Sequence, residues 1–149
     1  MLLEELCTLE PACCLRSTTI AAAARLMLRH HTGDLVVLND LENERQPTGI
    51  LTDRDIVVRV ISADLNPNTS CVGDVMSSPI VIASAQEDTA AALERMANHG
   101  VRRLPVTDAH GRILGVVTLD DLLREHAERT QAFLGIMTKE RKREQRAGG

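Results

Sequence analysis

The sequence contains almost no aromatic residues, since tryptophan and tyrosine are absent and Phe133 is the single phenylalanine. A core built from these 149 residues must therefore consist of aliphatic, alanine and methionine side chains. The shortage also removes the aromatic platform on which single-stranded nucleic acids usually stack their bases. A formal charge of −4 at pH 7 further disfavours a protein that wraps nucleic acid by charge alone.

A long apolar run is also lacking, because no stretch of about 18 apolar residues could span a bilayer. Glu4 and Glu5 lie where a secretion signal would carry lysine or arginine. These two absences predict a cytoplasmic protein that does not contact membranes. Hydrophobic residues at 44% and charged residues at 26% are typical of a globular domain that folds unaided.

Signatures of metal binding and catalysis are equally scarce. The cysteines lack the CxxC spacing of zinc and redox sites, and a cytosolic location would keep them reduced: Cys7, Cys13, Cys14 and Cys71. His30 and His31 are neighbours on a predicted helix, about 100° apart, so they cannot face one ion together. No nucleophile elbow, P-loop or paired catalytic carboxylates occur. We therefore expect no metal site and no enzymatic activity.

What the sequence does contain is an internal repeat. Segments 49–56 and 115–122 share a glycine, two aliphatic residues, a threonine, two variable residues, an aspartate and an aliphatic residue, at an offset of 66. Segments 35–38 and 103–106 form a second pair at an offset of 68. The difference between the two offsets predicts that the loop of the first repeat, residues 41–47, is two residues longer than that of the second. A period this long indicates that each unit packs on its neighbour.

Each unit is predicted to run strand, helix, strand, turn, strand, helix, which gives an α/β fold of two βαββα repeats. The expected strands are 13–15, 35–38, 48–52, 80–82, 103–106 and 113–118. The expected helices are 19–31, 53–62, 89–99 and 119–129. We divide the chain into a lead-in (1–11), a first repeat (12–68), a second repeat (69–131) and a basic C-terminal tail (132–149).

These motifs carry a family resemblance. Segments 72–76, 101–108 and 115–118, together with the tandem period, resemble a pair of CBS (cystathionine-β-synthase-type) domains. The resemblance implies two repeats packed about a pseudo-two-fold axis, with a cleft on each side. It also implies a non-catalytic, allosteric regulatory module that binds an adenine nucleotide (AMP, ADP or ATP, or else NAD or S-adenosylmethionine) and controls an unidentified protein.

The Thr-x-x-Asp motif occurs twice, as Thr52 with Asp55 and as Thr118 with Asp121. Because each motif follows a strand and opens a helix, its simplest interpretation is a threonine N-cap with an acidic residue at the third helical position. The family resemblance implies a second role, in which the aspartate holds both ribose hydroxyls while the threonine and nearby amides meet phosphate. The two roles are compatible.

Arginines near these motifs could bind phosphate: Arg54, Arg102 and Arg103. At the offsets above, Arg102 corresponds to Asp34 and Arg54 to Asp120, which predicts two clefts of unequal charge and affinity. The second cleft, beside Arg102 and Arg103, is then expected to prefer the more phosphorylated ligand, although Arg54 could reverse that order by reaching phosphate in the first cleft. The alternative is that these arginines are solvated surface charges.

A homodimer is expected because the helices after the two motifs present more aliphatic surface than one small layer can cover: Ile56, Val57, Val60, Ile61, Leu119, Leu122 and Leu123. The basic stretch 138–146 is interpreted as the end of a helix, where cations favour the negative end of the dipole. Two alternative functions stay open, namely a ligand-free structural dimerisation module and nucleic-acid contact through the tail.

Overall fold

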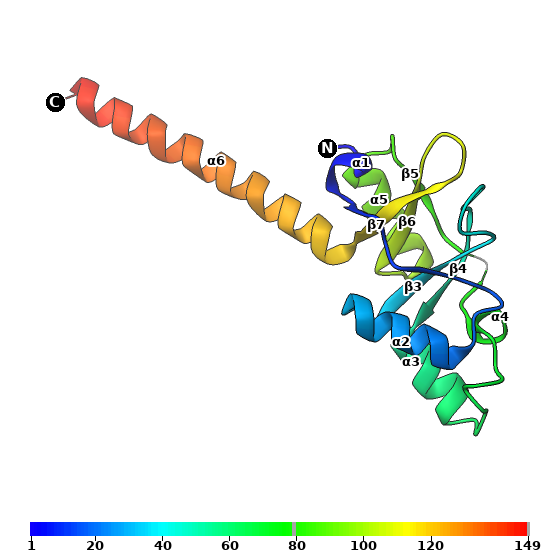
Figure 1. The fold of residues 1–149 in the computed structure, drawn as a ribbon. Helices are drawn as coiled ribbons and strands as arrows, with labels where there is room; N and C mark the ends of the chain where they lie inside the picture. Colours follow the sequence, from blue (N-terminus) through cyan, green and yellow to red (C-terminus); the bar gives the residue numbers. More distant parts are fainter. Residues whose placement is uncertain (79, 149) are drawn as a thin grey trace.

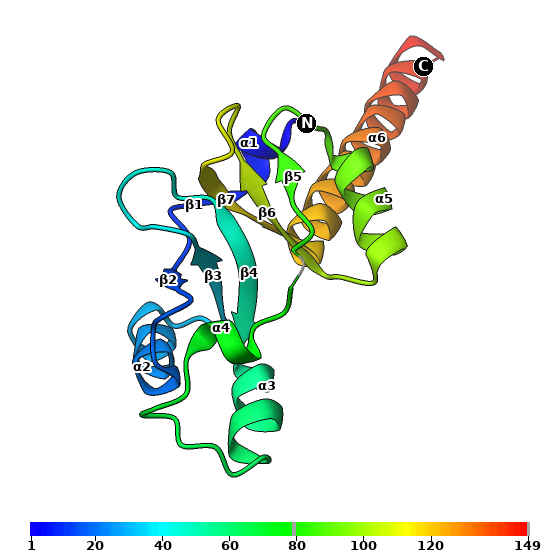
Figure 2. The same cartoon turned by 90° about the vertical axis from the view of Figure 1, so that its right-hand side faces the viewer.

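The computed structural model describes residues 1–78 and 80–148 and shows two small sheets that adjoin each other, with helices at opposite ends (Figures 1 and 2). The first repeat contains β2 (Cys13–Leu15), α2 (Ile20–His30), β3 (Asp34–Leu38), β4 (Pro47–Thr52), α3 (Asp53–Asp55) and the π-helical η1 (Ile56–Ile61). The second contains β5 (Ala83–Ser84), α5 (Thr89–His99), β6 (Arg103–Thr107), β7 (Ile113–Thr118) and α6 (Leu119–Gly148). A short lead-in precedes each repeat: α1 (Leu3–Leu6) with β1 (Thr8–Leu9), and α4 (Val72–Val75).

The two sheets have the same internal topology. The first has the order β2-β3-β4 and the second β5-β6-β7, with β1 added at the β7 edge. In each, the first strand is parallel to the second and the second is antiparallel to the third. This arrangement confirms the predicted α/β fold of two βαββα units.

Each lead-in packs on the other repeat. Strand β1 pairs with β7, while Ser77 exchanges two backbone hydrogen bonds with Ile50 of β4, at 2.9 and 3.3 Å. The buried Leu3 and Cys7 belong to the core of the second repeat, and the core of the first repeat contains residues from α4. Neither repeat therefore completes its core without a segment attached to the other.

Glycines at equivalent positions make this exchange possible. A Cβ atom on Gly115 would overlap the carbonyl oxygen of Thr8 and lie 2.8 Å from Cys7 Sγ. A Cβ atom on Gly49 would lie 2.6 Å from Met76 Sδ and 2.9 Å from the carbonyl oxygen of Ser77. The glycine that opens the repeated motif thus lets the opposite lead-in approach the sheet closely.

The register of the sheets corrects the predicted alignment of the repeats. Asp34 pairs with Thr52 in the first sheet, and Arg103 pairs with Thr118 in the second. Since the two threonines are equivalent, the predicted offset of 68 upstream of the loop is wrong, and the offset there is 69. The loop of the first repeat is accordingly three residues longer than that of the second. The sequence comparison missed this because the strands consist of similar aliphatic residues that align almost equally well after a one-residue slip.

Three predicted elements differ from the structure. Residues 80–82 are not a strand, because Ile80 and Val81 line a cavity instead and the strand forms one step later at β5. The predicted helix 53–62 splits into α3 and η1, in which Ser62 N–H donates to the carbonyl of Val57, five residues earlier. The β-branched valine and isoleucine residues of η1 crowd a regular α-helical turn, which is the reason we give for the wider π-helical turn.

The third difference lies at the C-terminus. The predicted helix 119–129 continues to Gly148 as a single helix, α6, which projects from the body (Figure 1). No proline interrupts residues 119–148, and most of their side chains favour helix formation. The segment interpreted as a tail is therefore part of this helix.

Part of the aliphatic surface expected to form a dimer interface is internal. Val60 and Leu122 are buried in the cores of their own repeats, at 0% and 6% exposure. Val57, Ile61 and Leu123 remain exposed. Within residues 1–78 and 80–148, no helix combines the length and apolar character needed to cross a bilayer.

Candidate functional site

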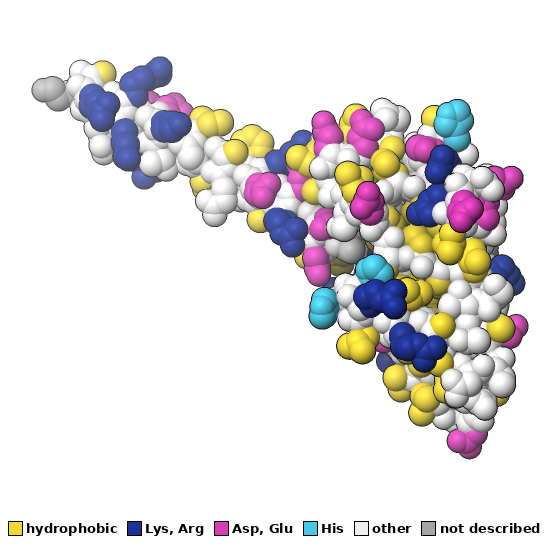
Figure 3. All heavy atoms as spheres, viewed as in Figure 1, with side chains coloured by type: hydrophobic (Ala, Val, Ile, Leu, Met, Phe, Trp, Pro, Cys, Tyr) yellow, Lys and Arg dark blue, Asp and Glu magenta, His cyan; other side chains and the backbone are white. Residues whose placement is uncertain are grey.

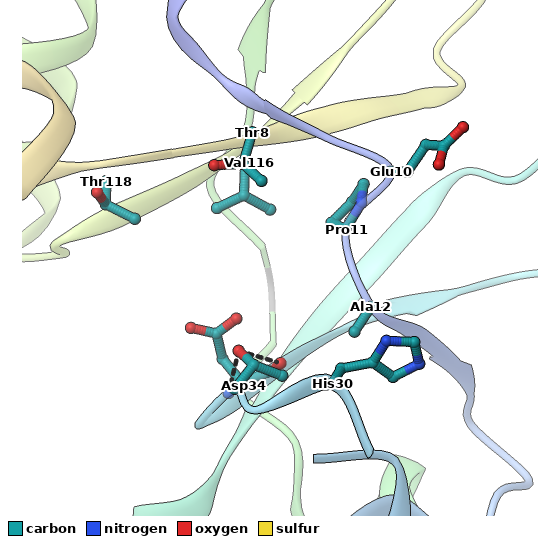
Figure 4. Close-up of a pocket in the computed structure, with 9 residues that line it drawn as sticks. Thr8, Glu10, Pro11, Ala12, His30, Asp34, Val116 and Thr118 are labelled. Carbon is teal, nitrogen blue, oxygen red and sulfur yellow. Dashed lines mark hydrogen bonds between the residues drawn. The ribbon is translucent and has the colours of Figure 1, made fainter. Parts of the chain in front are cut away.

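The main candidate site is a cavity of about 290 Å³ between the two repeats (Figure 4). The lead-in and the first repeat provide one wall, and β7 of the second repeat provides the other. Its lining residues are Thr8, Glu10, Pro11, Ala12, His30, Thr32, Asp34, Val116 and Thr118. Because both repeats line the cavity, any molecule bound there contacts both at once.

The lining is mostly polar and contains two acidic side chains, Glu10 and Asp34, but no lysine or arginine among the residues that the structure describes. Thr32 fixes the start of β3, since its hydroxyl donates to the carbonyl of Asp34 at 3.3 Å and accepts from the Asp34 N–H at 3.4 Å. Glu10 has a positive φ of 53°, a conformation that non-glycine residues adopt rarely and that often occurs at ligand sites. The aliphatic surface comes from Pro11, Ala12 and Val116.

A smaller cavity of about 80 Å³ occupies the equivalent place on the other side of the repeat pair. Its lining residues are Ile50, Ser77, Ile80, Val81, Val101 and Arg103. At the corrected offset these positions match Val116, Thr8, Pro11, Ala12, Thr32 and Asp34 of the larger cavity. The two cavities are therefore pseudo-symmetric in backbone and different in chemistry.

An ion pair connects the two cavities. Arg103 Nη1 lies 3.0 Å from Asp34 Oδ2, and the two side chains are 34% and 27% exposed. They occupy equivalent positions in the two repeats, so the pair crosses the pseudo-two-fold axis. Among the described residues, Arg103 Nε is buried and has no hydrogen-bond partner. The guanidinium thus has one donor that the present structure does not use.

Both Thr-x-x-Asp motifs form complete capping boxes. The Asp55 N–H donates to Thr52 Oγ1 at 3.1 Å, and the Thr52 N–H donates to Asp55 Oδ2 at 3.0 Å. The corresponding distances for Asp121 and Thr118 are 3.2 and 2.9 Å. The other carboxylate oxygen, Oδ1, lies 3.9 Å from Arg59 in the first motif and 3.5 Å from Arg124 in the second.

The sequence-predicted site residues do not all lie together. Thr118 lines the larger cavity and Arg103 the smaller one, whereas five others line neither: Thr52, Arg54, Asp55, Arg102 and Asp121. Arg54 and Arg102 are exposed. The predicted equivalence of Arg102 and Asp34 is wrong, because Arg102 corresponds to Gly33. The Arg102 carbonyl accepts from the Leu119 N–H, and the Gly33 carbonyl accepts from the Asp53 N–H, both at 2.8 Å.

Thr8, Glu10 and Pro11 were missed because the lead-in, residues 1–11, was predicted to lie outside the repeats. Asp34 was considered only as the acidic residue that takes the place of Arg102 in the other repeat, and not as a ligand contact. One pattern in the sequence could have shown that the lead-in belongs to the repeat. Glu5-Leu6-Cys7 matches Asp74-Val75-Met76 at an offset of 69, the same offset as between the strands.

Cysteines near the two cores are poor nucleophiles. Burial raises the pKa of the Cys14 thiol to about 12, and burial also raises the pKa of Cys7. In the described part of the chain, no group of three or more His, Cys, Asp or Glu side chains could hold a metal ion.

Known proteins share this sequence pattern and fold. A sequence model of the CBS domain matches residues 3–62 and 72–128. An uncharacterized protein of Methanopyrus kandleri is 34% identical over 106 residues, which span 71% of this chain and 53% of that protein. Hypoxic response protein 1 of Mycobacterium tuberculosis is 38% identical over 112 residues, which span 73% of this chain and 76% of the relative.

Solved structures agree with these matches. The crystal structure of Hypoxic Response Protein I with two coordinated zinc ions superimposes with a TM-score of 0.72 at 33% identity, covering 83% of this chain and 98% of the other. The CBS domain pair of protein MJ0100, in complex with 5′-methylthioadenosine and S-adenosyl-L-methionine, gives 0.72 at 20% identity, covering 87% and 98%. The chain belongs to the CBS domain family, with two CBS repeats in tandem.

Proposed function

We propose that this protein is a non-catalytic regulatory module that binds an adenosine-containing ligand between its two repeats. The observation that carries the proposal is the cavity of about 290 Å³, because its lining comes from both repeats. A ligand that prefers one arrangement of the repeats over another shifts the population toward that arrangement. A protein that contacts the repeats could detect this shift.

The adenosine class is supported by family membership and by the shape of the site. A cavity of this size, with polar side chains beside a smaller aliphatic surface from Pro11, Ala12 and Val116, suits a small polar organic ligand such as a nucleoside. A protein of the same fold, MJ0100, was crystallised with two adenosine compounds. Its identity of 20% supports a choice of probes rather than a ligand assignment.

The charge of the larger cavity favours ligands with few phosphates. Glu10 would repel a polyphosphate and attract the sulfonium and ammonium groups of S-adenosylmethionine, and Asp34 would do the same where the ligand replaces its contact with Arg103. The smaller cavity contains Arg103 instead, so a phosphate is better accommodated on that side. We therefore expect S-adenosylmethionine to bind more tightly than ATP in the larger cavity, and AMP, ADP, ATP or NAD to require Arg103.

The Thr-x-x-Asp motifs are proposed to bind ligand in addition to capping helices. Oδ2 of each aspartate is used by the cap, so the proposed acceptor of a ribose hydroxyl is Oδ1 of Asp55 or Asp121, which now faces Arg59 or Arg124. Thr52 and Thr118, with the neighbouring Arg54 and Arg102, are the proposed phosphate contacts. Because neither aspartate lines a cavity now, this mode of binding requires the ligand to extend beyond the cavity lining.

Isothermal titration calorimetry of the full chain with AMP, ADP, ATP, NAD and S-adenosylmethionine tests the proposal. We expect Asp34→Asn to weaken S-adenosylmethionine binding by about tenfold, since one charge-assisted contact contributes about 1.5 kcal/mol. Asp120→Asn, which removes an exposed carboxylate, is the matched control and should bind like the wild type. Absence of heat with all five ligands would instead favour a ligand-free dimerisation module.

The aspartates of the two motifs can be tested in the same titration. If Asp55 and Asp121 hold ribose hydroxyls, replacing either with asparagine should weaken binding by about 1.5–3 kcal/mol. If they only cap helices, the same changes should cost about 0.3–1 kcal/mol of stability and leave affinity unchanged. Thermal unfolding of each variant separates the two outcomes.

A further inference from the structure

The distal half of α6 carries an apolar cluster that has no partner in the described part of the chain. Every residue from 126 to 148 is exposed. Four large apolar side chains lie near its middle, each between 52% and 67% exposed: Phe133, Leu134, Ile136 and Met137. Figure 3 shows hydrophobic (yellow) side chains along the projecting helix and basic (dark blue) side chains toward its end. Single exposed apolar residues are ordinary, but a cluster of this kind usually marks an interface.

This cluster continues a face that is already used for packing. Residues 119, 123, 126, 130, 133 and 137 follow one another at alternating steps of four and three, the spacing of a coiled-coil seam. The first three line a groove against α5, together with Thr89, Ala90 and Leu93. Since α5 begins at Thr89 and the groove reaches Arg129, the seam loses its intrachain partner just before the apolar cluster.

We propose that the same face of α6 from a second copy of this chain covers the cluster, with the two helices antiparallel and related by a two-fold axis near residues 133–137. A two-fold axis at this point places each cluster on its copy, which is the self-complementarity that an isologous interface requires. It also leaves the two CBS pairs at opposite ends of the helix pair, where they do not collide.

Charges on the seam favour the antiparallel orientation. The alternating spacing continues to Glu140 and Glu144. In a parallel pair each glutamate would face its own copy, which places two like-charge contacts in the seam. In an antiparallel pair with Phe133 opposite Met137, the partner of Glu144 is His126 and that of Glu140 is Thr130. No like charges then meet in the seam.

The charges along the rest of α6 also favour the antiparallel orientation. Residues 139–146 contain five basic and two acidic side chains, whereas residues 120–128 contain four acidic and one basic. The antiparallel arrangement brings the basic end of each helix toward the acidic beginning of the other, and the parallel one brings like ends together. The net charges of the neighbouring helix ends therefore attract each other in the antiparallel pair.

A membrane or nucleic acid fits this surface less well. Four of the five basic residues of segment 139–146 lie about 120° or more around the helix from Met137, so a flat membrane could not contact the apolar cluster and these charges together. Nucleic acid would leave the apolar cluster exposed. A second helix is the partner that covers the seam and leaves the basic side chains in solvent.

Sedimentation equilibrium of the full chain tests the interface. We expect the mass of Phe133→Glu/Met137→Glu to be half that of the wild type. The control variant Gln131→Glu/Ala132→Glu adds the same charge on the other side of the helix and should keep the wild-type mass. A monomeric wild type, or a seam variant with the wild-type mass, would overturn the proposal.

Disulfide trapping tests the orientation. Under mild oxidation, His126→Cys/Glu144→Cys should form a covalent dimer, while each single variant should not. The wild type, whose cysteines are buried or half-buried, controls for background. A covalent dimer of Glu144→Cys alone would show a parallel pair and contradict the proposal. Monomeric wild type that binds phosphatidylserine vesicles through the cluster would contradict it as well.

Discussion

The two inter-repeat cavities share one backbone framework and differ in chemistry. Equivalent strands, caps and glycines build both, yet the position that carries Asp34 in the larger cavity carries Arg103 in the smaller one. The comparison teaches that the aliphatic pattern of the strands determines the symmetric fold, whereas a few polar positions determine what each side can bind. Substitutions at equivalent positions of the two repeats therefore distinguish residues that stabilise the fold from residues that determine ligand binding.

The largest expected effect concerns the shared framework. Leu35 and Leu104 are equivalent core residues, each 0% exposed. Replacing either with alanine should lower the free energy of unfolding by about 3 kcal/mol, because it removes buried methyl groups and leaves a cavity. The two costs should agree within about 1 kcal/mol. Urea denaturation measures both, and a much larger difference would show that the cores are not equivalent.

Alanine substitutions at the two glycines that the lead-ins approach, Gly115 and Gly49, should differ in their cost to stability more than the two leucine substitutions do. Gly115→Ala brings its Cβ into the backbone of Thr8, whereas Gly49→Ala meets the flexible end of Met76 most closely and the carbonyl oxygen of Ser77 only at 2.9 Å. We expect a cost of about 3 kcal/mol for the first and about 1 kcal/mol for the second. Thermal unfolding of both variants would reveal the order, and a greater loss for Gly49→Ala would rule out this explanation.

A smaller effect is expected at the two caps. Thr52→Ala and Thr118→Ala should each lower stability by about 1 kcal/mol, because each removes the oxygen that accepts an N–H at the start of a helix. Only Thr118 also lines the larger cavity, so only Thr118→Ala should weaken ligand binding there. Equal loss of affinity in the two variants would mean that the caps act on binding through stability alone.

The smallest effect belongs to the ion pair between the cavities. Asp34 and Arg103 are both partly exposed, so their interaction should contribute less than about 1 kcal/mol to folding. A double-mutant cycle with Asp34→Asn and Arg103→Gln measures this coupling. It should weaken further at high salt. A coupling of several kcal/mol would indicate that the pair stabilises the fold instead of linking two binding sites.

The fold could be predicted from the sequence because the repeat appears twice in the same order. Residues 113–118 and 89–99 are the predicted strand and helix to the residue, as β7 and α5. The one-residue slip at Asp34 was not avoidable by pattern alone, since Leu35, Val36 and Val37 are interchangeable in a strand. The exchange of lead-ins was invisible as well, because it depends on contacts between Gly115 and a segment more than a hundred residues earlier.

The candidate site was predictable only in part. Threonine and aspartate at the fixed spacing of three residues identified the two caps, because that geometry is local. The larger cavity is formed by Glu10, Asp34 and Thr118, which come from segments far apart in the sequence. Only the packing of one repeat on the other brings such residues together.

The central claim is that one ligand contacts both repeats in the larger cavity, and NMR titration of the labelled full chain tests it most directly. Adding S-adenosylmethionine should shift the amide signals of Ala12 and Thr32 in the first repeat together with those of Val116 and Thr118 in the second. Both sets should follow one binding curve, and Asp34→Asn should displace that curve to higher concentration. Shifts confined to a single repeat, or none at saturating ligand, would contradict the account.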